Sequence, residues 1–236
     1  MSRFSRHLFV SSLALLLIAP CVFAQRDQQK RLEEAGTVMQ EILSTPDNIP
    51  RKIMDHAKCV VVLPSVVKGA FVVGGSYGHG AMVCRGGPDF TGPWGTPAMY
   101  SLEGISFGFQ AGGQATDFVL LIMNDSGVNS ILRSKVKLGG DVSIAAGPIG
   151  RDAEADTDAF MRAKILSYSR SRGIFAGVSL EGATLHPDDD ANAALYGHGI
   201  RARQIVEGPS APESPAAAAL LIRELSRVSP HFRSKA

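Results

Sequence analysis

The sequence predicts an α+β fold in which a coiled, glycine-rich and mainly antiparallel β-sheet, or a small barrel, is flanked by N- and C-terminal helices. Of the 25 glycines, 21 fall between Gly69 and Gly182, and this stretch is rich in the β-branched and aromatic residues that favour strands. Both ends of the chain instead carry apolar residues at helical spacing. The separation of these two patterns along one chain is typical of an α+β architecture.

Residues 1–24 have the form of a secretory signal peptide, with two arginines, an apolar stretch and a short small-residue end. The apolar stretch is too short for a comfortable membrane span. We expect cleavage after Ala24 and export to the periplasm or to the outer membrane of a bacterial envelope. Cleavage before Cys21, followed by lipidation, is the alternative.

Export changes the charge balance, because the signal peptide carries Arg3 and Arg6 but no acidic residue. Removing these two from the 24 basic residues leaves 22, which equals the number of acidic residues. A chain without net charge exerts no general attraction on nucleic acid. We therefore expect no nucleic-acid partner, and an anionic ligand has to meet a local cluster of positive charge.

Apolar residues recur at helical spacing from Gln25 to Leu43, which predicts an amphipathic helix. Leu32, Met39 and Ile42 lie on its apolar face. The basic residues near its start are Arg26, Lys30 and Arg31. Such a helix can lie on a membrane surface, and the alternative is that its apolar face packs permanently on the β-sheet.

The β region opens with an apolar run from Cys59 to Leu63, a corner from Pro64 to Gly69, and a long strand from Ala70 to Arg85. We interpret these segments as strand, turn and strand. If the second strand is straight, Cys84 lies roughly 30 Å beyond the partner of Cys59. A coiled or closed sheet could still bring the two cysteines together in an oxidising compartment, so a disulfide and two buried thiols both stay open.

Four glycines interrupt the second strand, namely Gly74, Gly75, Gly78 and Gly80. Glycine weakens an ordinary strand, so this density predicts bending, bulges or the close approach of another backbone. Replacing Gly75 or Gly78 by valine should therefore destabilise the fold.

The remaining elements alternate along the chain. A breaker-rich loop from Gly86 to Pro97 carries the single tryptophan, which is expected to fold down on the core. The apolar run from Phe118 to Met123 predicts a buried central strand. The other expected elements are a short helix at 50–57, a helix at 128–134, a strand at 138–149, a hairpin at 163–185, a helix at 188–196 and a helix at 216–228. We divide the chain into a signal peptide (1–24), a main domain (25–206), and a Pro-rich linker with a C-terminal helix (207–236).

Two G-x-S-x-G matches make Ser76 and Ser106 candidate nucleophiles. That motif requires a strand, a sharp turn and a helix, whereas the sequence after each serine continues as glycine-broken β sequence. A calcium loop near Asp188 is also disfavoured, because Ala193 stands where the turn glycine is required. We expect no enzyme activity, cofactor or metal, and a hydrolase of envelope lipid remains the alternative.

Positive charge clusters locally. Lys52, Lys58 and Lys68, together with Arg51, are opposed only by Asp55. Two further clusters contain no acid: Arg133, Lys135 and Lys137, and Arg162, Lys164, Arg170 and Arg172. If such clusters converge in space, they form a face suited to anionic lipid headgroups.

Several ordered motifs resemble the SYLF domain family. They are Ala57-Lys-Cys-Val-Val-Val-Leu-Pro64, Gly69-Ala-Phe-Val-Val-Gly-Gly-Ser-Tyr-Gly-His-Gly80, Trp94-Gly-Thr-Pro97, Gly140-Asp-Val-Ser-Ile-Ala-Ala-Gly-Pro148 and Tyr168-Ser-Arg-Ser-Arg-Gly-Ile-Phe-Ala-Gly-Val-Ser-Leu180. The resemblance covers residues 28–203. It implies a non-catalytic domain that binds phosphoinositide-containing membranes and, in yeast, actin filaments. Bacterial members are typically exported lipid-binding proteins.

These observations predict a non-catalytic protein of the cell envelope that binds anionic phospholipid through its N-terminal helix and local basic clusters. Actin is not expected as a partner in that compartment, and an envelope scaffold that contacts only other proteins is a further alternative. The predicted lipid-binding residues are Arg26, Lys30, Arg31, Leu32, Met39, Ile42, Lys52, Lys58 and Lys68.

Overall fold

The computed structural model describes residues 25–70, 73–107, 112–150, 162–171, 174–207 and 211–233. The predicted signal peptide and the alternative lipidation site at Cys21 lie outside these residues. Within the described part of the chain, no helix combines the length and the apolar character needed to cross a membrane.

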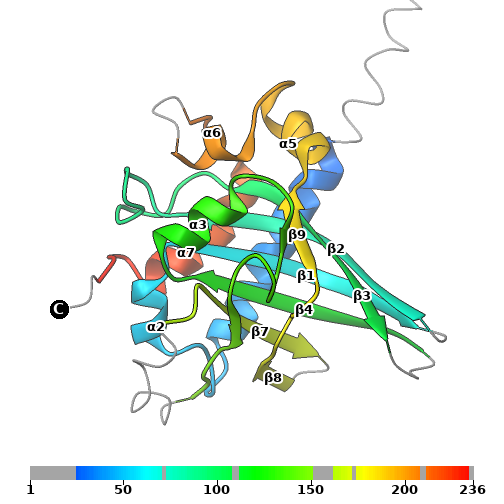
Figure 1. Cartoon of the computed structure of the whole chain (residues 1–236). Coiled ribbons are helices and arrows are strands. Elements are labelled where there is room, and N and C mark those ends of the chain that lie inside the picture. The colour runs from blue at the N-terminus through cyan, green and yellow to red at the C-terminus, as the bar shows by residue number, and fades with distance from the viewer. Residues whose placement is uncertain are drawn as a thin grey trace, which may run out of the picture.

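One nine-stranded sheet forms the centre of the molecule (Figure 1). Its main path runs in the order β5-β9-β3-β2-β1-β4-β7-β6, and β8 pairs with β7. All pairings are antiparallel except that of β6 with β7. The strands are β1 (Cys59–Ala70), β2 (Val73–Cys84), β3 (Ala98–Phe107), β4 (Gly112–Ile122), β5 (Val136–Lys137), β6 (Ile144–Ala146), β7 (Ile165–Ser171), β8 (Ile174–Gly177) and β9 (Thr184–Pro187).

Helices cover both faces of this sheet. The N-terminal helix is described over residues 25–43, as predicted. The other helices are α2 (Arg51–His56), α3 (Asp125–Ile131), α5 (Asp189–Tyr196), α6 (Ala202–Glu207) and α7 (Ala219–Val228), the last preceded by a 3-10 turn (Ala216–Ala218). The predicted α+β class is confirmed. The sheet is curled, and among the described strands it stays open between β5 and β6 rather than closing into a barrel.

Alternate residues of the central strands feed two separate cores. Val60 and Val62 of β1 pack with the N-terminal helix, α2 and α7 on one side of the sheet, which we call the closed face. Cys59 and Val61 pack with α3 and α6 on the other side, which we call the groove face. This alternation follows from the two-residue period of a strand. In Figure 1, α3 and α6 lie in front of the sheet and α7 lies behind it.

The prediction of a turn at Pro64 to Gly69 is wrong. The strand β1 continues through this segment to Ala70, and an irregularity between Leu63 and Val66 absorbs the proline. Ser65 there has φ 49°, and its backbone N–H donates to a carboxylate oxygen of Asp117 at 2.8 Å. A bulge therefore replaces the expected turn, as bulges do where a strand has to accommodate a proline.

Because β1 runs to Ala70 and β2 begins at Val73, the two cysteines lie opposite each other. Cys59 pairs with Cys84 in the register of β1 and β2, their Cα atoms lie 4.0 Å apart, and their sulfur atoms form a disulfide. The expected displacement of roughly 30 Å assumed the wrong turn. The disulfide therefore needs no closed barrel, because the pairing of the adjacent strands β1 and β2 already aligns its residues.

Two glycines of β2, Gly78 and Gly80, allow β1 to approach closely and do not have positive φ. A Cβ at Gly80 would lie 1.9 Å from the carbonyl oxygen of Val62, and one at Gly78 would lie 2.5 Å from a methyl carbon of Val66. Both contacts arise beside the bulge of β1. Gly75 differs, since its nearest neighbour would be 3.8 Å away. The prediction of a packing role fits Gly78 and Gly80 but not Gly75.

The breaker-rich loop folds onto the closed face, as predicted for its tryptophan. Trp94 is buried and donates its indole N–H to the carbonyl oxygen of Ser229 at 3.0 Å. The Arg85 guanidinium lies 4.2 Å from the Trp94 ring centre and donates to both oxygens of Ser229. Burial lowers the pKa of Arg85 to about 10, although the charge of Asp55 opposes this. These contacts hold the end of α7 on the same core.

The other predicted elements meet mixed outcomes. The strand from Phe118 to Met123 is confirmed as β4, between β1 and β7. The helix after Asp188 and the C-terminal helix are confirmed as α5 and α7. The strand expected at 138–149 is reduced to β6, and α6 was not expected. Leu221 and Leu225 of α7 are fully buried in the closed-face core, so this helix is packed into the body of the fold.

Candidate functional site

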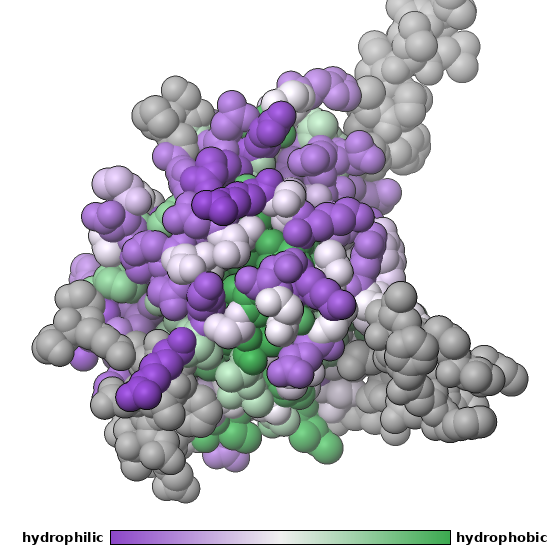
Figure 2. All heavy atoms as spheres, in the orientation of Figure 1, coloured by the Kyte–Doolittle hydropathy of each residue, from purple (hydrophilic) through white to green (hydrophobic). Residues whose placement is uncertain are grey.

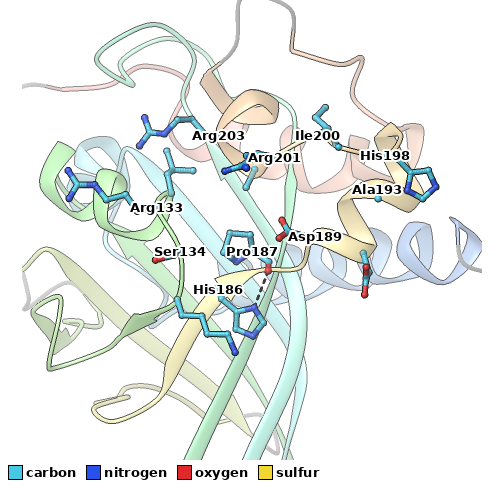
Figure 3. A pocket seen from close by; sticks show the side chains of 15 residues that line it. Arg133, Ser134, His186, Pro187, Asp189, Ala193, His198, Ile200, Arg201 and Arg203 are labelled. Atoms are coloured by element: carbon cyan, nitrogen blue, oxygen red, sulfur yellow. Dashed lines mark hydrogen bonds between the residues drawn. The ribbon is translucent and has the colours of Figure 1, made fainter.

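An open groove of about 820 Å³ lies where the end of α3, strand β9 and helices α5 and α6 meet. We call it the basic groove. Its charged lining residues are Arg133, Lys135, Arg201, Arg203, Asp189 and Asp190. Figure 3 shows the three arginine side chains toward one side of the groove, with Asp189 and His198 toward the other. The face of the molecule that carries these helices is covered mainly by hydrophilic side chains (Figure 2).

Three short helices fix the walls of the basic groove. The side chain of Asn124 caps α3 by accepting from the backbone N–H of Gly127 at 2.9 Å. The buried Asn192 of α5 bonds both backbone groups of Met99, at 2.8 and 3.1 Å, and so attaches α5 to β3. Ala202 and Ile205 of α6 are buried in the groove-face core. The arginines thus project from anchored elements.

The charges of the groove are unequally satisfied. Arg203 donates to Glu207 at 2.7 Å and to Asn129 at 3.1 Å, and Lys135 lies 3.9 Å from Glu103. The guanidinium groups of Arg133 and Arg201 have no ion-pair partner among the described residues. Both residues are exposed. Two guanidinium groups without ion-pair partners among the described residues therefore lie beside the basic groove. A guanidinium group is planar and carries several N–H donors, so each can bind a phosphate or a carboxylate.

Only half of this groove was predicted from the sequence. The cluster of Arg133, Lys135 and Lys137 was noted, but Arg201 and Arg203 were missed. Their signal was weak, consisting of two arginines in an Arg-Ala-Arg run after a glycine-rich turn. The two halves lie about seventy positions apart in the sequence, and only the packing of α6 beside α3 brings them together.

A second polar cluster joins His79, Ser101 and Asp188. The Nδ1 atom of His79 lies 2.8 Å from the Ser101 hydroxyl and 2.9 Å from the Asp188 carboxylate, and Ser101 also donates to Asp188 at 3.2 Å. Serine and aspartate thus share one ring nitrogen. A catalytic triad requires the serine on one nitrogen and the carboxylate on the other. Ser101 is moreover buried, so this cluster is arranged for structure.

Burial favours a raised pKa for Asp188, but hydrogen bonds from His79, Ala191 and Ser101 outweigh it and lower the pKa to about 2. Asp188 also caps α5 and lies 3.7 Å from Arg31 of the N-terminal helix. It therefore connects α5 with two strands and with the closed-face helix.

Ser76 does not lie on an elbow, because it stands inside β2, which continues to Cys84. Ser106 is the last but one residue of β3, and the described chain resumes at Gly112 as strand β4. Within the described residues neither serine is followed by the turn and helix that the motif needs. The hydrolase alternative therefore lacks local structural support at Ser76.

The predicted membrane contacts of the N-terminal helix separate into two groups. Arg26 and Lys30 are exposed, and Lys30 lies 3.7 Å from Glu34. Arg31 is half-buried and bonds Gln28 at 3.0 Å. Leu32, Met39 and Ile42 are fully buried in the closed-face core. In this structure those three side chains contact the sheet, which is the alternative left open above, and membrane contact by them would require the helix to detach.

The three predicted lysines do not form one site. Lys52 is exposed on α2. Lys58 is buried, and its ammonium group bonds Asp125 at 2.6 Å and the carbonyl oxygen of Asp89 at 2.7 Å. The side chain of Lys68 lies outside the described residues. Lys58 was predicted to meet lipid, but in this structure its charge is already satisfied within the protein.

The comparison with known families gives a match over residues 103–228 to the Ysc84 model, described as "Las17-binding protein actin regulator". This range covers more than half of the chain. The chain belongs to the Ysc84 family. The resemblance to the SYLF domain family is thereby confirmed, and the match includes α7 as well as the sheet edges.

Several curated proteins are similar to the chain. The SH3 domain-containing protein PJ696.02 of Schizosaccharomyces pombe is 38% identical over 190 residues, covering 79% of this chain and 43% of its own. The human SH3 domain-containing YSC84-like protein 1 is 36% identical over 69% of this chain and 47% of its own. LAS seventeen-binding protein 3 of Saccharomyces cerevisiae is 33% identical over 73% and 37%. The chain therefore spans less than half the length of these relatives.

Proposed function

We propose that this protein is a non-catalytic lipid-binding protein of the cell envelope that holds the phosphate of anionic phospholipids in the basic groove. The observation that carries the proposal is that Arg133 and Arg201 lie beside the basic groove and have no ion-pair partner among the described residues. Arg203 and Lys135 add positive charge, and Asp189 and Asp190 offset part of it. Guanidinium groups bind phosphate oxygens with two parallel hydrogen bonds.

The N-terminal helix contributes to this function through charge rather than through insertion. Arg26 and Lys30 are exposed at its start, where each can add up to about 1 kcal/mol near an anionic surface. Releasing Leu32, Met39 and Ile42 from the core would cost about 5–9 kcal/mol, at about 1.5–3 kcal/mol for each buried side chain. Insertion into a membrane would regain a similar amount for these three side chains, but it would uncover the sheet residues beneath them, such as Val60 and Val62. The docked arrangement is therefore favoured.

Export to the periplasm or outer membrane, with cleavage after Ala24, belongs to the same proposal and rests on the sequence of residues 1–24. Lipidation at Cys21 would give an equivalent location with a covalent anchor. The disulfide between Cys59 and Cys84 supports an oxidising compartment. In such a compartment actin would not be met, whatever the relatives bind.

Vesicle sedimentation tests the groove. We would compare the chain from Gln25 onward, which contains every described element, with its Arg133→Ala/Arg201→Ala variant on phosphatidylglycerol and on phosphatidylcholine vesicles. Loss of two guanidinium contacts should weaken binding to the anionic vesicles about tenfold or more.

The matched control is Arg51→Ala/Arg223→Ala, which removes two exposed arginines from helices of the closed face and should retain binding. If the control loses as much binding, charge alone acts and the groove is not the site. If neither vesicle binds the unmodified chain, the proposed function is wrong.

Protein binding is the second candidate function, because the family description and one relative's name refer to Las17 binding. A scaffold without lipid affinity would fail the sedimentation test while still retaining a protein partner. The hydrolase alternative is tested separately with a fluorophosphonate probe. We expect no labelling of the folded chain, and labelling that disappears in Ser76→Ala or Ser106→Ala would contradict a non-catalytic role.

A further inference from the structure

A second cavity, of about 560 Å³, lies where β2, β3, β5 and β9 meet. We call it the polar hollow. Its lining residues are Ser76, Tyr77, Glu103, Gly104, Lys137 and Thr184, with Gly182 at the margin. None of the proposals above uses this cavity, and all of its lining side chains belong to described residues.

The sheet loses its outer strand β9 at this cavity. The strand β9 pairs with β3 only from Tyr100 to Glu103, where Glu103 faces Thr184. From Gly104 onward, β3 has a partner only on its β2 side within the described strands. Tyr77, Glu103, Thr184 and Lys137 are paired in register and so share one face of the sheet, because side chains alternate along a strand. Ser76 and Gly104 face the other side and contribute only backbone to the opening. The end of β9 beside β3 thus creates the polar hollow.

Tyr77 gives the polar hollow an aromatic wall. This residue is 52% exposed, although large aromatic side chains normally bury most of their surface. Its ring is held by an edge-to-face contact with His79, at 4.7 Å between ring centres and 87° between planes. An exposed aromatic ring held in place beside a cavity is suited to covering the apolar face of a ligand.

Three polar groups on the Tyr77 face of the hollow are available. The hydroxyl groups of Tyr77 and Thr184 have no hydrogen-bond partner among the described residues, and neither does the ammonium group of Lys137. Glu103 lies 3.3 Å from His186 and 3.9 Å from Lys135, both on the side of the basic groove. One carboxylate and one ammonium group give the hollow no net charge. It therefore lacks the positive excess that would select a phosphate.

We propose that the polar hollow binds a sugar ring of an envelope glycan. A pyranose has an apolar ring face, which matches Tyr77, and a rim of hydroxyl groups that both donate and accept. Glu103 would accept from these hydroxyls, Lys137 would donate to them, and Thr184 can do either. The cavity volume falls within the range of small-ligand sites. This site is independent of lipid binding, so either proposal can fail alone.

Backbone amide titration by NMR tests the site with defined probes, namely maltose, N,N′-diacetylchitobiose and sorbitol. Sorbitol carries similar hydroxyls but has no ring face. We expect saturable shifts at Tyr77, Gly104 and Thr184 with at least one disaccharide and none with sorbitol. Tyr77→Ala should weaken binding about tenfold, while Tyr77→Phe retains the ring and should weaken it less. The control Val67→Ala truncates the exposed cross-strand neighbour of Tyr77, which does not line the hollow, and should leave affinity unchanged.

Several outcomes would overturn the proposal. These are the absence of shifts with both disaccharides, equal response to sorbitol, or sugar binding that survives both Tyr77→Ala and Glu103→Gln. The free edge of β3 could instead accept an extended peptide as an added strand. A hexapeptide of alternating threonine and valine that shifts the amides of Gly104–Phe107, where neither sugar does, would assign the edge to peptides and overturn the sugar site.

Discussion

The two faces of the sheet differ in how they treat charge. On the closed face, Arg85 is fully buried and donates to the carbonyl oxygens of Ala57 and Ser229. On the groove face, Arg133 and Arg201 are exposed without ion-pair partners in the described part of the chain. Arginine thus stabilises the fold on the closed face and is available to a ligand on the groove face. Amphipathic periodicity identifies the first kind of face, and unsatisfied charge identifies the second.

The largest expected effect breaks the closed face. Leu32→Asp/Ile42→Asp places two carboxylates in a fully buried core, which should cost more than about 5 kcal/mol and unfold the domain. Urea unfolding followed by circular dichroism measures this. The control Thr37→Asp/Gln40→Asp uses exposed positions of the same helix and should change stability by about 1 kcal/mol or less. A folded double variant would show that the helix is not part of the core.

The second prediction compares one arginine from each face. Arg85→Met leaves the carbonyl oxygen of Ala57 and the hydroxyl oxygen of Ser229 without their arginine donor, which should destabilise the fold by about 3 kcal/mol. Arg133→Met on the groove face should change stability by only about 0.5 kcal/mol. Thermal unfolding of both variants decides. Equal losses would mean that the arginines of the two faces do not differ in role.

These two predictions show what the sequence could and could not reveal. The spacing of Leu32, Met39 and Ile42 predicted the helix correctly, because helical periodicity is a local property. The same spacing could not tell a membrane from a sheet as the partner of that helix, since both reward apolar burial equally. In the structure these three side chains pack on the sheet.

The turn between the first two strands was misplaced for a similar reason. Pro64 and Gly69 carry local turn signals, and nothing nearby in the sequence shows that a bulge and the carboxylate of Asp117 accommodate the chain there. The basic groove was out of reach because α6 was not expected and its arginines are distant in sequence. Long-range packing, rather than residue type, creates the site.

The third prediction concerns the strands that both faces share. Reducing the disulfide, or replacing it as Cys59→Ala/Cys84→Ala, should lower stability by about 3 kcal/mol because it frees a loop with a sequence separation of 25. Thiol counting on unreduced, unfolded protein should detect no free thiol. Urea midpoints with and without reductant measure the effect. Two reactive thiols, or an unchanged midpoint, would contradict it.

The smallest expected effect lies at Asp188, where the two faces meet. Its pKa of about 2 lies below the ordinary value of 3.8, so its ionised form is favoured by folding. This contribution is fully present above about pH 4 and is lost as the pH falls toward 2. We expect it to be worth about 1–2 kcal/mol, reduced from the full linkage value because solvent still reaches the site.

Asp188→Asn should remove this part of the acid dependence, whereas Asp190→Asn, on the same helix but without these bonds, should retain it. Urea midpoints measured between pH 5 and pH 2 compare the two. If the two variants lose stability in parallel with the unmodified chain, the bonds of Asp188 to His79 and Ser101 do not couple the faces.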